Sequence, residues 1–193
     1  VTTDSTINKP QDFNGKKIGI WRSGFREIAT SFVNSFNLDV RFVPINSTIN
    51  LFLYGGIDAQ VTMWYNEYHS IINSGINEDE MHTFFFADYG LDVPEDGIYM
   101  LQNRFDSETV KRFRKATLEA WKYTFENKEE ALVLVNTEMN NKHIPFNLAH
   151  QTWMLNRLYD LFNNPDKSYT PGELNKTDFD AAYKIFNSLG KIE

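Results

Sequence analysis

Three short apolar runs, separated by segments of helical period, constrain the fold of this chain more than any other feature. The runs cover residues 17–21, 39–43 and 58–63, and each is typical of a β-strand. Residues 25–36, between the first two runs, repeat apolar side chains at helical spacing, and residues 47–53 indicate a second, shorter helix. Strands joined through helices pair in parallel. We therefore predict an α/β protein built on a central, mostly parallel sheet.

The rest of the chain changes character along its length. Residues 67–76 indicate a helix, and the run HTFFF at residues 82–86 indicates a fourth, buried strand. A loop rich in Gly, Pro and Asp follows and leads to a further strand at residues 97–101. From residue 106 onward the pattern is helical only, so we predict a helical C-terminal half with helices at 106–126, 128–141, 146–163 and 176–189.

Composition excludes several classes of function. The chain has 193 residues and a net charge of −7, and its 19 basic residues are dispersed, so a nucleic-acid partner is not expected. It has no cysteine, and no apolar run approaches the length of a membrane span. The acidic loop near residue 90 lacks the spacing of a calcium-binding loop. We predict no metal and no cofactor, because the four histidines stand apart, at positions 69, 82, 143 and 150.

The strand at residues 58–63 ends in a cluster of aromatic and polar side chains, which we take as the main candidate site. Trp64 and Tyr65 offer flat faces for a planar ring, while Asn66 and Glu67 offer hydrogen-bonding groups that suit an aminopyrimidine. Open α/β sheets bind ligands at such strand ends. The alternative is that the aromatics belong to the core and that Glu67 begins a solvated helix.

A second candidate stretch follows the first strand. There a strand end and a helix N-terminus would present backbone N–H groups and aromatic rings to a polar ligand. The alternative is a simple connecting turn with Trp21 in the core. The residues of this stretch are Trp21, Ser23, Gly24 and Phe25.

Several stretches together resemble one family. They are PQDFNGKKIG at 10–19, WRSGF at 21–25, MWYNEYH at 63–69, PEDGIY at 94–99, HQTWML at 150–155 and PGEL at 171–174. In this order they are similar to the type II periplasmic binding proteins that capture thiamine-pyrimidine precursors. The resemblance implies a type II binding-protein lobe that holds an aminopyrimidine-like ligand. It also implies a periplasmic or extracellular protein, free or anchored to the membrane, that serves a membrane permease of the ABC type.

The resemblance also suggests how the chain is organised. Residues 1–11 are expected to form a tail or linker, 12–96 the second α/β lobe, and 97–193 a return strand and C-terminal helices. Family members carry a first lobe before the segment that resembles residues 10–19, so we expect this chain to be a truncated version. The surface left uncovered would favour association with a second copy, and a single lobe would bind ligand weakly.

Two alternatives to transport remain open at this level. The same module can serve as the ligand-sensing domain of a membrane receptor kinase or cyclase, since ligand-driven closure suits both outputs. Eukaryotic relatives of the family synthesise the thiamine pyrimidine with an iron site and a cysteine-rich motif. Because this chain has no cysteine, we predict a binding protein rather than an enzyme.

Overall fold

The computed structural model describes residues 1–22, 25–94, 97–101, 103–164 and 170–190. The chain divides into two compact units, one formed by Val1–Val93 with Lys176–Glu193 and the other by Pro94–Asn175. The observed division therefore differs from the expected one chiefly at the last helix. The sequence pattern groups that helix with the C-terminal half, whereas in the structure it packs with the first unit.

A small parallel sheet forms the centre of the first unit. Its strands are β1 (Lys17–Trp21), β2 (Arg41–Ile45) and β3 (Ala59–Gln60), in the order β2-β1-β3, with both neighbours parallel to β1. The prediction of an α/β fold with a parallel sheet is confirmed. β2 begins two residues later than predicted, and β3 is only 2 residues long.

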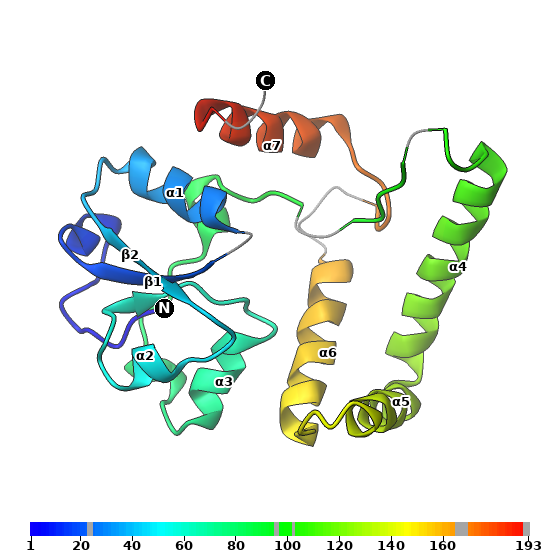
Figure 1. Cartoon of the computed structure of the whole chain (residues 1–193), viewed down its shortest axis with the longest axis horizontal. Coiled ribbons are helices and arrows are strands. Elements are labelled where there is room, and N and C mark those ends of the chain that lie inside the picture. Colours follow the sequence, from blue (N-terminus) through cyan, green and yellow to red (C-terminus); the bar gives the residue numbers. More distant parts are fainter. Residues whose placement is uncertain (23–24, 95–96, 102, 165–169, 191–193) are drawn as a thin grey trace. The chain divides into compact units, whose positions relative to one another are not determined.

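Helices lie on both sides of this sheet. Figure 1 shows α1 (Arg26–Ser35) and α7 (Lys176–Ser188) on one side of β1 and β2, and α2 (Asn50–Leu53) and α3 (Glu67–Asn73) on the other. Three short 3-10 helices complete the unit, at Pro10–Phe13, Glu78–Glu80 and Phe86–Tyr89. The helices expected near 25–36, 47–53 and 67–76 are therefore present, each shorter than predicted.

An aromatic cluster fills the space between α1 and the sheet. Helical spacing puts the apolar residues of α1 on one face, and Ala29, Phe32 and Val33 are buried there. Phe32 occupies the centre of the cluster, with ring centroids 5.1–6.2 Å from four other aromatic rings, those of Phe13, Phe36, Phe86 and Tyr89. Ile185 of α7 packs against the same core, which is why the last helix belongs to this unit.

The predicted fourth strand at residues 82–86 is wrong. His82 forms an isolated antiparallel bridge with Thr2, and the chain continues into a 3-10 helix from Phe86 to Tyr89. Two causes explain the difference. The open edge of β3 is already used by Val1, which exchanges backbone hydrogen bonds with Gln60. The apolar side chains of the HTFFF run are instead buried by packing against the aromatic cluster. The ring centroids of Phe84 and Phe13 lie 4.9 Å apart.

The predicted tail at residues 1–11 is also ordered and packed. Thr2 and Ile7 are fully buried, and the Thr2 hydroxyl donates a hydrogen bond of 2.6 Å to the carbonyl of Asp58. The carboxylate of Asp4 pairs with the Lys16 ammonium at 2.8 Å and also accepts hydrogen bonds from the backbone N–H and hydroxyl of Thr6. The polar composition of this segment hid its two buried residues.

The Asp4 contacts predict a dependence of stability on pH. Lys16, and then Thr6, hold the pKa of the Asp4 carboxyl well below its ordinary value of 3.8. The unfolded chain therefore binds this proton more tightly, so the stabilisation is complete above that value and declines as the pH falls below it. We expect urea unfolding to show a difference between wild type and Asp4→Asn that is largest near neutral pH and shrinks at about pH 3.

The matched control is Asp79→Asn. Asp79 is an exposed carboxylate that forms no ion pair among the residues the structure describes. Its substitution should leave the unfolding free energy unchanged at both pH values. Equal pH dependence in wild type and Asp4→Asn would contradict the assignment.

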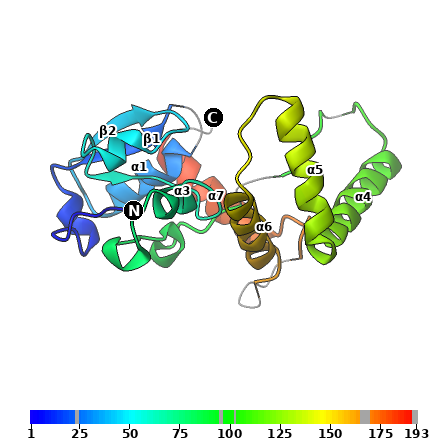
Figure 2. The ribbon, with the colours of Figure 1, turned by 90° about the horizontal axis from the view of Figure 1, so that it is seen from below.

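The second unit consists of three helices in series, α4 (Ser107–Glu126), α5 (Lys128–Asn141) and α6 (Leu148–Phe162) (Figure 2). The three predicted helices are confirmed within two residues at each end. Asp106 caps α4 by accepting a hydrogen bond from the Thr109 N–H at 2.8 Å, and this contact lowers the pKa of its carboxyl. Aromatic contacts join α4 to α6, among them Trp121 and Phe162 at 5.0 Å.

The strand predicted at residues 97–101 is not formed. No described residue pairs with this stretch, which lies in neither helix nor strand, and the side chains of Ile98, Tyr99 and Leu101 are exposed. A strand requires a hydrogen-bonded neighbour, and none reaches this segment in the part of the chain that the structure describes.

Candidate functional site

The carboxyl ends of β1 and β3 define the candidate site. β1 lies in the middle of the sheet, so the chain leaves it toward β2 on one side and returns to β3 on the other. Such a reversal of strand order is where open α/β sheets bind ligands. Both stretches predicted from the sequence follow these two strand ends, because Trp21 closes β1 and residues 61–67 continue from β3. The fold therefore brings the two stretches to one edge of the sheet.

The backbone at the end of β1 is unusual. Phe25, directly before α1, has φ 54° and ψ 1°, a left-handed conformation that is rare for a bulky residue. Its side chain is 39% exposed, and its ring lies 5.7 Å from that of Trp21, inclined at 67°. Strain of this kind gathers at functional sites. The predicted residues Ser23 and Gly24 lie outside the described residues.

The cluster after β3 is half-buried. Trp64, Tyr65 and Asn66 each keep part of their surface open to solvent, so they are neither core nor fully exposed. Trp64 meets the ring of Phe85 edge to face at 6.0 Å. Rings fixed on one side and open on the other suit a flat ligand. The site role of these three residues stays a prediction.

Glu67 begins a helix, as the alternative interpretation of the sequence expects, but its side chain is not solvated. It begins α3 but is only 8% exposed, so the alternative of a solvated helix start is wrong for this residue. Its carboxylate accepts hydrogen bonds from the Met63 N–H at 3.1 Å and from the Asn66 side-chain amide at 3.3 Å. The carboxylate therefore closes the turn between β3 and α3. A carboxylate has about four acceptor positions, so further donors can still be received.

Three further polar side chains lie near this turn: Tyr68, which the motif offers as another flat face, His69, and Gln60, which the sequence pattern did not single out. Tyr68 donates from its hydroxyl to Glu78 at 3.3 Å, and burial is the main reason that its pKa is raised. His69 is buried, with a ring nitrogen 3.2 Å from the side-chain amide of Asn73. Gln60, the last residue of β3, is 1% exposed. Its place between Ala59 and Val61 was the available signal, because a polar residue in an apolar run is unusual in a buried strand.

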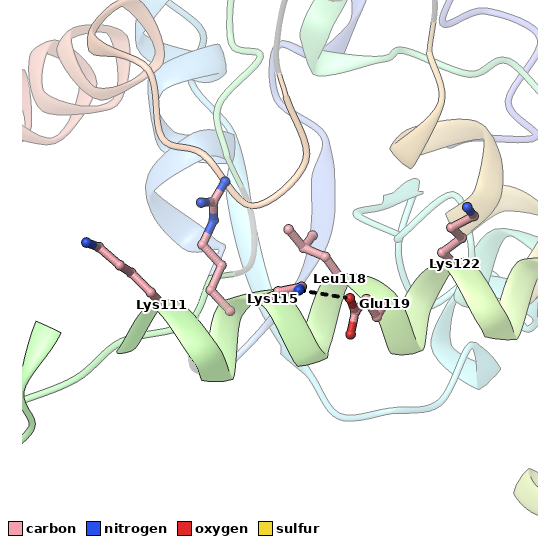
Figure 3. A pocket seen from close by; sticks show the side chains of 6 residues that line it. Lys111, Lys115, Leu118, Glu119 and Lys122 are labelled. Atoms are coloured by element: carbon pink, nitrogen blue, oxygen red, sulfur yellow. Dashed lines mark ion pairs between the residues drawn. The ribbon is translucent and has the colours of Figure 1, made fainter. Parts of the chain in front are cut away.

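A hollow on the surface of α4 is a different kind of feature (Figure 3). It encloses about 440 Å³, and its lining residues are Lys111, Arg114, Lys115, Leu118, Glu119 and Lys122. Most of these charged side chains form ion pairs with neighbours: Arg114 pairs with Glu173 at 2.8 Å, and Lys115 pairs with Glu119 at 3.7 Å. Pairs of this kind are ordinary on a solvated helix. We assign no ligand to this hollow.

The comparison with known families decides the relationship of the chain. Residues 1–131 match the NMT1/THI5-like family, so the match spans the whole sheet and both candidate stretches. The chain belongs to the NMT1/THI5-like family. This confirms the family suggested by the sequence motifs, and membership of the NMT1/THI5-like family indicates a solute-binding protein. No curated protein matches the chain.

Among the described residues of this NMT1/THI5-like protein, none of the helices has both the length and the apolar character needed to span a bilayer.

Proposed function

We propose that this NMT1/THI5-like protein captures an aminopyrimidine-like compound, of the thiamine-pyrimidine type, for a membrane permease of the ABC type. The observation that carries the proposal is the meeting of two aromatic stretches at the switch point of the parallel sheet. Trp21 ends β1 and Phe25 precedes the helix after it, while Trp64 and Tyr65 follow β3. The capture would take place in the periplasm or outside the cell.

The chemistry of the site suits this class of ligand. An aminopyrimidine is flat and combines ring nitrogens, which accept hydrogen bonds, with an exocyclic amine, which donates. Aromatic side chains bind such a ring through its faces. Asn66 and Glu67 stand beside the rings with amide and carboxylate groups, and the free acceptor positions of Glu67 match the amine.

Titration of the ¹⁵N-labelled protein with 4-amino-2-methylpyrimidine, followed by NMR, tests the proposal. We expect saturable binding with a dissociation constant of about 1 mM or tighter, a range that suits a small, incompletely enclosed ligand. The shifted amide signals should gather at residues 21–25 and 60–67. No saturation, or shifts that gather on α4 to α6, would refute the proposed site.

Association with a second copy is part of the same proposal. Three consecutive apolar residues of α5, Val133, Leu134 and Val135, are exposed and form an apolar patch in the middle of this helix. An exposed apolar patch favours association with another surface. We expect the solution mass, measured on the samples used for titration, to rise above that of a monomer with increasing concentration. A constant monomer mass would exclude this association.

A further inference from the structure

The Gln60 side chain is a buried amide without a partner. Neither its oxygen nor its nitrogen has a hydrogen-bond partner among the residues that the structure describes. Its backbone, by contrast, is fixed: the N–H donates to the Val1 carbonyl at 2.9 Å, and the carbonyl accepts from Val1 at 2.8 Å. Buried amides are nearly always paired, because an unpaired one loses its hydrogen bonds to water without replacement.

The place of Gln60 in the fold links this amide to the candidate site. Gln60 ends β3 and lies opposite Gly19 of β1, so it stands at the switch point itself. A Cβ built on Gly19 would meet Ile57 and Ile45, which shows that the sheet next to Gln60 is packed with apolar groups. Gly19 has no side chain, so the opposite strand offers no polar side chain at this position to pair with the amide. Residues 61–66 of the candidate cluster follow Gln60 directly.

We propose that Gln60 determines ligand specificity by pairing its amide with the hydrogen-bonding edge of the bound heterocycle. A primary amide carries an acceptor and a donor side by side. A 4-aminopyrimidine carries the complementary pair: its amine donates to Oε1, and its adjacent ring nitrogen accepts from Nε2. The inference rests on the proposed function, and it deepens that function by naming the side chain that recognises the hydrogen-bonding edge of the ligand.

Contact with Gln60 requires a local movement, because the side chain is covered. The proposal assigns this movement to residues 61–66, which lie in neither helix nor strand between β3 and α3. The Met63 and Asn66 contacts to Glu67 hold this turn in its present form. A ligand that takes over hydrogen bonds from Glu67 and pairs with Gln60 therefore favours the shifted form.

The test compares two probes on three proteins. The probes are 4-amino-2-methylpyrimidine and 2-methylpyrimidine, which lacks the amine. Wild type should prefer the amino compound by about tenfold or more, as expected for a site built to pair with the missing group. Gln60→Met, which keeps the length of the side chain without its polar atoms, should lose most of this tenfold preference, because Glu67 alone then accepts from the amine. Its melting temperature should equal or exceed that of wild type, because the unpaired amide is gone.

Ser31→Ala is the matched control. The Ser31 hydroxyl, on α1, is also buried without a partner among the described residues, but it lies away from the strand ends. Its removal should leave the preference for the amino probe intact. Gln60→Leu serves as a second apolar variant if Gln60→Met does not fold.

The outcomes separate the inference from the function on which it rests. If wild type binds neither probe, both fail. If wild type binds and Gln60→Met or Gln60→Leu keeps the tenfold preference, the role of Gln60 alone is overturned. Failure of both apolar variants to fold also overturns it, because the amide would then be needed for the structure itself.

Discussion

Replacing Phe32 with alanine is expected to lower the free energy of unfolding of the first unit by about 3–5 kcal/mol. Phe32 is buried at the centre of the aromatic cluster, where its ring meets others from the 3-10 helices as well as from α1. Rings around it come from segments far apart in the chain, so they cannot all move to close the cavity. Since domains are typically stable by about 5–15 kcal/mol, the loss is a large share of the total.

Urea denaturation followed by far-ultraviolet circular dichroism measures this loss. The control is Phe113→Ala on α4, whose side chain is 57% exposed and which should change the unfolding free energy by less than about 0.5 kcal/mol. If the two substitutions had equal effects, the aromatic cluster would not be the core of the first unit.

Replacing Trp21 with alanine is expected to weaken binding of 4-amino-2-methylpyrimidine by about tenfold or more. Stacking between an aromatic side chain and a nucleic-acid base contributes about 1–3 kcal/mol, and a pyrimidine ring presents the same kind of face. Trp21 ends the central strand at the switch point and is half-buried against Phe25. Its ring is therefore held in place while part of it stays open.

Tyr54→Ala is the control for this substitution. Tyr54 is 86% exposed and follows α2 on the way into β3, toward the amino ends of the strands and the opposite edge of the sheet. Its removal should leave the dissociation constant unchanged in the same NMR titration. Full binding by Trp21→Ala, with its spectrum otherwise intact, would remove β1 from the site.

The helices were the most predictable part of the fold. The apolar period of α1, and the uninterrupted helical pattern from residue 106 onward, depend on neighbours three and four positions away, so local sequence determines them. Strand β1 was predicted with its observed bounds, because its apolar run is flanked by turn residues. The prediction of a strand at 82–86 was wrong. A run of aromatic residues can be buried either in a sheet or by packing against a helix, and the sequence does not distinguish the two.

The placement of the two candidate stretches at strand ends was predictable, but their side-chain contacts were not. A strand that delivers Trp64 to Glu67 marks a site by its composition, and the parallel order of β1 and β3 then brings Trp21 to the same edge. That Glu67 turns its carboxylate onto Met63 was not visible, because hydrogen bonds within a turn depend on backbone direction. Gln60 was missed because its burial comes from the sheet rather than from its neighbours in the chain.

Local sequence was enough to predict the class of the fold, most of its helices and the family, and to propose the two candidate stretches. Each of these depends on local period or on residues close together in the chain. The tertiary structure decided which segments share a core: residues 1–11 close the edge of β3, and α7 joins α1 rather than the helices before it. Such choices depend on which apolar faces meet and which backbone edges remain open, and only the folded chain brings those faces and edges together.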